Sequence, residues 1–249
     1  MNIIVSENAA QLGVVAGGHA AKVIRSAIEK KGQAVIILAT GSSQFETLYN
    51  LTKEDIEWSK VIMFHLDEYI GLPESSPASF RRYLKERFIQ KVGPLKEVYL
   101  VKGDEDPVRE CNRLNALIHG HRVDVALVGI GENGHLAFND PPADFETELP
   151  YIIVDLDEKC RSQQMGEGWF KTIEEVPRQA ISMSIKQIMK SGEIICAVPD
   201  SRKAIAVRDC FEQPVSNLFP ASILQQHKNC YCYLDQSSAA LLKTVFFKD

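Results

Sequence analysis

Short apolar runs with the character of buried strands alternate with helix-like segments along the whole chain. One helical pattern places Ala20, Ile24 and Ile28 on the same face and stops near Gly32. Such alternation favours a parallel sheet that is covered by helices on both sides. We therefore expect an α/β fold, a Rossmann-like three-layer αβα arrangement with a mainly parallel sheet of about seven strands. The candidate strands are residues 2–5, 34–39, 61–65, 98–101, 123–128, 151–154, 193–198 and 230–234.

The chain of 249 residues contains no internal repeat, low-complexity tract or break in composition, so we expect residues 1–249 to form a single domain. A formal net charge of -5 argues against nucleic acid or an anionic membrane surface as the main partner. No apolar run is long enough to span a membrane, and the N-terminus lacks the basic start of a signal peptide. Six scattered cysteines are typical of reduced thiols. These features predict a cytoplasmic protein.

Four polar clusters come directly after candidate strands. Because parallel strands end at the same edge of a sheet, all four clusters should project from the carboxyl edge, where open α/β sheets bind ligands. Four polar clusters placed independently of one another would not all fall at the same edge, so we expect the clusters to form one site. They are Thr40-Gly41-Ser42-Ser43, Asp67-Glu68, Gly129–Asp140 and Ser201–Lys203.

The first two clusters have ordinary interpretations as well as functional ones. A hydroxyl-rich glycine turn before a helix can cradle a phosphate, but it is equally typical of a serine helix cap. Asp67 and Glu68 could be part of a simple turn or could transfer protons. Their meaning depends on the third cluster.

The third cluster, Gly129–Asp140, carries a histidine among amide and carboxylate groups on a glycine-rich loop. His135 in such a setting suits proton transfer, although a tight turn with a satisfied histidine is the plain alternative. The loop also spells G-x-G-x-x-G, the dinucleotide fingerprint. That motif requires a helix after its last glycine, and Pro141-Pro142 leaves little room for one, so we do not favour a dinucleotide cofactor.

Three further segments are predicted from local patterns. Ser76-Pro77 resembles an N-cap and first helical residue, which predicts a helix to about Phe88. The polar segment 161–172, with Trp169-Phe170 between glycine and lysine, could be a flexible lid or a surface loop. Ser237–Val245 could form a closing helix.

With these clusters, the chain resembles the glucosamine-6-phosphate deaminase/isomerase family, whose superfamily includes the 6-phosphogluconolactonases. The resemblance covers most of the chain. The segment from Leu66 to Leu72 (LDEYIGL) resembles the family's catalytic-base motif, and that from Gly129 to Asn139 (GIGENGHLAFN) resembles its signature. The turn from Leu38 to Ser43 and the lysine of Arg202-Lys203-Ala204 are weaker matches to its phosphate-binding elements.

The resemblance implies isomerisation and deamination of a 2-amino-sugar 6-phosphate without a cofactor or a metal. Asp67 would take the C2 proton, and His135 would assist ring opening, oriented by Asn133 and Asp140. Lys203 would hold the phosphate. The resemblance also implies substrate contacts from the following residues: Thr40, Gly41, Ser42, Ser43, Glu68, Gly129 and Arg161.

Two departures from the family pattern concern the site. Asp140 replaces the usual glutamate, which shortens by one methylene the group that would orient His135. Gly168 falls where a lid arginine normally helps to hold the phosphate, and Arg161 or Lys171 could substitute for it.

Two other functions remain open at the sequence level. One is a 6-phosphogluconolactonase, although Leu136-Ala137-Phe138-Asn139 differs from the sequence usual in that branch. The other is a catalytically weak regulator that binds sugar phosphates. The sequence does not distinguish gluco from galacto substrates, and it leaves a homo-oligomer possible.

Overall fold

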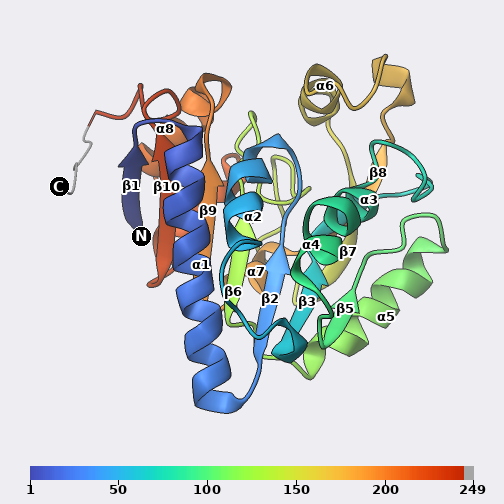
Figure 1. Ribbon diagram of the computed structural model, residues 1–249. Coiled ribbons are helices and arrows are strands. Elements are labelled where there is room, and N and C mark those ends of the chain that lie inside the picture. Colours follow the sequence, from blue (N-terminus) through green and yellow to red (C-terminus); the bar gives the residue numbers. More distant parts are fainter. Residues whose placement is uncertain (244–249) are drawn as a thin grey trace.

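The computed structural model describes residues 1–243. Its main sheet has seven strands, all parallel, in the order β1-β10-β9-β6-β2-β3-β5 (Figure 1). The expected α/β fold with a mainly parallel sheet of about seven strands is therefore confirmed. The strands are β1 (Asn2–Ser6), β2 (Ala34–Leu38), β3 (Val61–His65), β5 (Glu97–Tyr99), β6 (Val125–Val128), β9 (Glu193–Val198) and β10 (Cys230–Asp235).

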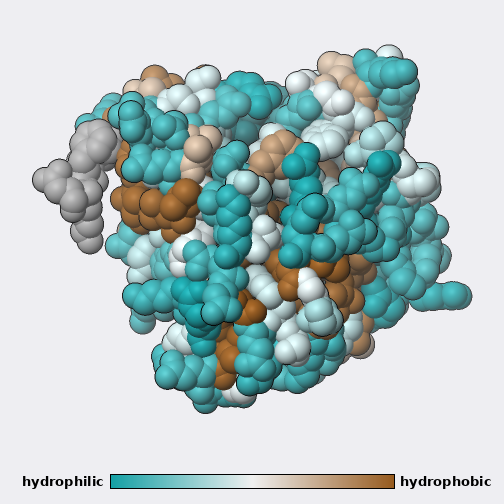
Figure 2. Space-filling view, viewed as in Figure 1, coloured by the Kyte–Doolittle hydropathy of each residue, from teal (hydrophilic) through white to brown (hydrophobic). Residues whose placement is uncertain are grey.

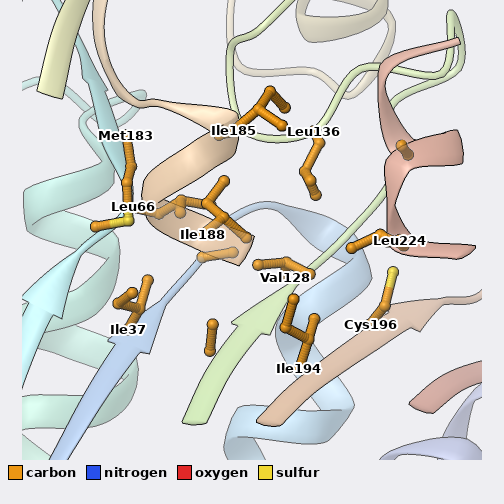
Figure 3. Packing of buried hydrophobic residues seen from close by; sticks show 14 of the residues in the cluster. Ile37, Leu66, Val128, Leu136, Met183, Ile185, Ile188, Ile194, Cys196 and Leu224 are labelled. Atoms are coloured by element: carbon orange, nitrogen blue, oxygen red, sulfur yellow. The ribbon is translucent and has the colours of Figure 1, made fainter. Parts of the chain in front are cut away.

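The central strands β2, β3 and β6 are buried along their whole length, which is why they are apolar on both faces rather than alternating. On one face, Ile36 and Leu38 pack in a core with residues of α1 (Ala9–Lys31) and α2 (Phe45–Leu51). On the other face, Ile37 packs in a second core with α5 (Pro107–His119), α7 (Ile185–Met189) and α8 (Ala204–Glu212) (Figure 3). The sheet is therefore the middle one of three layers, with a hydrophobic core between it and the helices on each face.

A second, three-stranded sheet was not expected. It pairs β4 (Asp67–Tyr69), β8 (Gln179–Met183) and β7 (Tyr151–Asp155) in antiparallel fashion, in the order β4-β8-β7. The predicted strand 151–154 thus exists, but it belongs to this sheet. The β8 strand was not predicted from the sequence. Asp67 and Glu68, expected at the exit of β3, themselves form the edge strand β4.

Several helix boundaries are set by caps. α1 ends at Gly32 as expected, with a left-handed cap (φ 78°) that only glycine adopts easily. The helix predicted from Ser76-Pro77 instead begins at Phe80, because Ser79 accepts the backbone N–H of Arg82. It runs as α3 (Phe80–Leu84), a π-helical stretch (Lys85–Ile89) and α4 (Gln90–Val92).

Two predicted segments differ from the structure. The first part of the segment 161–172, expected as a lid or a surface loop, lies in a regular helix, α6 (Glu158–Gly166), which is capped by Asp157. The expected closing helix Ser237–Val245 is not formed within the described chain, where residues 236–241 are turns, and its last two residues lie outside the described range. Asp235 accepts the hydroxyl of Ser237 and the N–H of Ser238 in the first of these turns.

One face of the surface is seen in Figure 2. Figure 2 shows a viewed face that is mainly hydrophilic, with hydrophobic side chains gathered in small patches. Among residues 1–243, no helix combines the length and the apolar character that crossing a membrane requires.

Candidate active site

A cavity of about 60 Å³ lies at the carboxyl edge of the main sheet, as expected from the sequence. All four polar clusters contribute to its wall. The predicted site residues that line it are Thr40, Gly41, Ser42, Ser43, Asp67, Gly129, His135 and Lys203. Residues that are far apart in the sequence therefore meet in one place.

The hydroxyl-rich turn is held from beneath by Gln44, which is buried. Its side-chain amide donates to Ser43 Oγ and to the carbonyls of Val128 and Ala197 at the ends of β6 and β9. A Cβ at Gly129 would lie only 3.0 Å from Ser43 Oγ, so glycine lets the two clusters approach without a shift of the Ser43 side chain. The turn is thus fixed against the sheet with its hydroxyls at the cavity.

Asp67 is an acidic residue in the wall of the cavity and is only 5% exposed. Burial raises the pKa of its carboxyl to about 8, and the neighbouring Glu68 contributes in the same direction. A carboxyl group with such a pKa can both take and return a proton near neutral pH.

Glu68, in contrast, does not reach the cavity. Its carboxylate is fully buried and accepts the hydroxyl of Ser79 and the backbone N–H groups of Phe80 and Arg81 at the start of α3. The structure therefore places this predicted substrate contact in a supporting role, as the group that ties β4 to α3. Successive side chains of a strand point to opposite faces, so Asp67 and Glu68, which are adjacent in β4, point to opposite sides.

His135 is oriented by the residues predicted for that role. Its Nδ1 lies 2.9 Å from Asp140 Oδ1, and the side-chain amide of Asn133 donates to the same oxygen. Asp140 Oδ2 accepts the N–H of Asp157. The shorter aspartate therefore still reaches the imidazole, and the other ring nitrogen, Nε2, remains on the side of the cavity that Gly131 borders.

The charge on Asp140 is secured by its partners. Burial alone would raise the pKa of this carboxyl, but the hydrogen bonds from His135 and Asn133 outweigh it, and the pKa is lowered. A carboxylate that stays ionised holds the Nδ1–H of His135 and leaves Nε2 free to exchange protons with a ligand.

Lys203 supplies the positive charge of the cavity. It closes a short turn before α8 and is only 4% exposed. Burial lowers the pKa of its ammonium, whereas Glu167 and Glu132 act in the opposite direction. A buried cation next to three hydroxyl groups is suited to binding an anion.

Arg161 does not join the cavity. Its guanidinium donates to the carbonyls of Ile173 and Val176, which it uses to fasten the chain that continues from α6. The residues that the α6 region does bring to the cavity are Gln163, Gln164 and Glu167, which were not predicted from the sequence. The only signal was the position of Glu167 between Gly166 and Gly168.

A potential ligand group for a metal lies behind His135. Ligand atoms of His135, Asp140 and Cys160 fall within 4.8 Å of one another. However, Asp140 already accepts three hydrogen bonds, and burial raises the pKa of the Cys160 thiol well above its usual value, whereas a metal needs the thiolate. The arrangement fits a histidine–carboxylate pair better than a metal centre.

A buried acid, an oriented histidine and a buried lysine beside hydroxyl groups lie together at the edge of a parallel sheet, a combination suited to proton transfer on a small anionic ligand. Comparison with known proteins makes the class specific. Residues 7–232 match the family of glucosamine-6-phosphate isomerases and 6-phosphogluconolactonases, so the chain belongs to that family.

Relatives over the full length carry one name. The chain is 35% identical over 98% of its length to the whole of a glucosamine-6-phosphate deaminase of Lactobacillus delbrueckii subsp. bulgaricus. It is 34% identical over 97% of its length to 89% of the corresponding protein of Bacillus cytotoxicus.

Solved structures agree in fold. A monomeric glucosamine-6-phosphate deaminase superposes with a TM-score of 0.87 at 30% identity, with 97% of this chain and 100% of that chain covered. The 6-phosphogluconolactonase of Trypanosoma brucei reaches 0.80 at 17% identity, covering 97% of this chain and 98% of that one, which is a likeness of fold alone.

Proposed function

We propose that this protein converts glucosamine 6-phosphate and water to fructose 6-phosphate and ammonia. The observation that carries the proposal is the meeting of Asp67, His135 and Lys203 in one cavity at the carboxyl edge. Full-length relatives with this name support the same reaction.

The groups of the cavity suit the steps of such a reaction. Lys203 and the hydroxyls of Ser42 and Ser43 would hold the phosphate through charge-assisted hydrogen bonds. His135 Nε2 would exchange a proton with the sugar oxygens and so open the ring. Asp67 would then take the proton from C2 and return it to C1, and water would release the amine from C2 of the resulting imine as ammonia.

The raised pKa of Asp67 has a functional consequence. With a pKa of about 8, the carboxyl is partly protonated at neutral pH and its ionised form is a stronger base than an ordinary aspartate. We therefore expect turnover to rise with pH through this range, until the acid partner loses its proton.

An assay of ammonia release tests the proposal. Purified protein is given glucosamine 6-phosphate, galactosamine 6-phosphate and, separately, 6-phosphogluconolactone, with acid release monitored for the lactone. Ammonia from an amino sugar phosphate supports the deaminase. Acid release from the lactone without ammonia would assign the chain to the other branch of its family.

A regulator that only binds the phosphosugar is the second candidate, favoured by the missing lid arginine. It is separated by exchange of the C2 hydrogen in deuterated water. Binding without exchange would identify a regulator, whereas exchange requires a base at C2.

The six cysteines are free and buried, which supports a reducing compartment such as the cytoplasm.

A further inference from the structure

A carboxylate occupies the corner of the cavity where a phosphate would bind. Glu167 lines the cavity together with the hydroxyl-rich turn and Lys203. Its Oε2 accepts the hydroxyl of Ser42, and the same oxygen would lie 3.9 Å from a Cβ at Gly41. The hydroxyl-rich turn therefore already holds an anion, the carboxylate of Glu167, which belongs to the protein itself.

Glu167 is held in this place by its own segment. The side-chain amide of Gln163 donates to Oε1 at 2.8 Å, and the indole N–H of Trp169 donates to Oε2 at 3.3 Å. Burial lowers the pKa of Lys203, and the negative charge of Glu167 partly opposes that shift. Of the cavity groups that suit a phosphate, Ser42 already donates to Glu167, and Lys203 lines the same cavity.

The size of the cavity leads to the same conclusion. At about 60 Å³ it is far smaller than the roughly 300 Å³ or more of typical ligand pockets. Movement of Glu167 away from Ser42 would enlarge this cavity. Glu167 comes after the last turn of α6 and stands between Gly166 and Gly168, of which Gly168 has a φ of 84° that favours glycine. Neither chain neighbour of Glu167 therefore has a side chain that would restrict a change in its backbone.

We propose that Glu167 is an internal competitor for the substrate's phosphate: its carboxylate fills the proposed phosphate corner until the phosphate displaces it from Ser42. Carboxylate and phosphate cannot share the corner, because both are anions and both need the same donors. The inference rests on the proposed phosphate site and concerns how that site is filled. Competition from Glu167 would raise the substrate concentration at which half of the sites are occupied.

The competition has a measurable size. If Glu167 fills the corner in about nine molecules of ten, the apparent dissociation constant for a phosphate ligand is raised about tenfold. Glu167→Gln keeps the shape and the hydrogen bonds with Gln163 but removes the charge. It should therefore bind inorganic phosphate about fivefold to tenfold more tightly than the native chain.

The binding of inorganic phosphate and of glucosamine 6-phosphate to the full chain is measured by calorimetry. Glu158→Gln, which removes an exposed carboxylate from the other end of α6, is the matched control and should leave both dissociation constants within about twofold. Unchanged or weaker phosphate binding by Glu167→Gln would overturn the proposal. Weaker binding of the amino sugar alone would also overturn it, because Glu167 would then bind the amine.

Trp169 gives an independent readout. Phosphate should break the hydrogen bond from its indole to Glu167 and so change its fluorescence, and Trp169→Phe should remove that change while the buried Trp58 remains. No change in Trp169 emission at saturating phosphate counts against displacement.

The two proposals fail in different ways. Ammonia release without tighter phosphate binding in Glu167→Gln removes the competitor and leaves the deaminase. Tighter phosphate binding in a chain that releases no ammonia keeps the competitor and removes the proposed reaction.

Discussion

Asp67→Asn should abolish ammonia release and at the same time stabilise the fold at alkaline pH. The carboxyl of Asp67 is buried, and its pKa in the folded chain is raised from 3.8 to about 8. The folded state therefore holds a proton that the unfolded state gives up. The stability that this proton provides is complete below pH 3.8 and is lost as the pH rises to about 8.

The magnitude is set by the size of the shift. At about 1.4 kcal/mol for each unit of pKa, a shift of about four units sets an upper limit of roughly 5 kcal/mol at pH 8. An asparagine leaves its own buried amide to be satisfied, which costs about 1–3 kcal/mol. We therefore expect the variant to gain about 2 kcal/mol over the native chain at pH 8 and to lose this advantage near pH 4.

The assay is urea unfolding at pH 4, 6 and 8, monitored by circular dichroism, on the native chain and on Asp67→Asn. Asp55→Asn, which changes an exposed aspartate, is the control and should show a difference near zero at every pH. A difference between Asp67→Asn and the native chain that does not grow from pH 4 to pH 8 would refute the raised pKa. Near-normal turnover of the variant would refute the assignment of the base.

Three further predictions concern other residues. Lys203→Ala should raise KM for the phosphosugar about tenfold or more, with a smaller effect on kcat, in steady-state kinetics. Arg161→Ala should leave KM unchanged but lower the free energy of unfolding by about 1–2 kcal/mol, as urea unfolding will show. Gly131→Ala should reduce kcat by about a hundredfold, because the new Cβ would overlap with the imidazole of His135; an unchanged kcat would show that the histidine position is not critical. Burial lowers the pKa of His65 to about 3, so the native fold should lose stability as the pH falls from 6.5 towards 3. The same loss of stability in a His65→Gln variant, measured by urea unfolding, would contradict this explanation.

Much of the site could be derived from local sequence because it depends on a property that local sequence carries. Apolar runs locate the strands, and the residues just after each strand must lie at the carboxyl edge when the strands are parallel. That reasoning was sufficient to bring Ser42, Asp67, His135 and Lys203 together. The pair of His135 and Asp140 was also predictable, since the two residues share one short loop.

The remaining assignments depend on contacts between distant segments. Glu68 and Asp67 are adjacent and chemically alike, but only the pairing of β4 with β8 decides which of them faces the cavity. Likewise, Arg161 has the charge expected of a phosphate ligand, yet the carbonyls of Ile173 and Val176 hold it elsewhere.

The sequence by itself therefore determined the parallel sheet, its catalytic edge and the types of chemical group at that edge, because burial and alternation leave a local record along the chain. Only the tertiary structure decided which of these groups face one another, how far Asp67 is removed from water and that Glu167 reaches Ser42. Those outcomes depend on the distance and direction between side chains that the chain brings together only on folding.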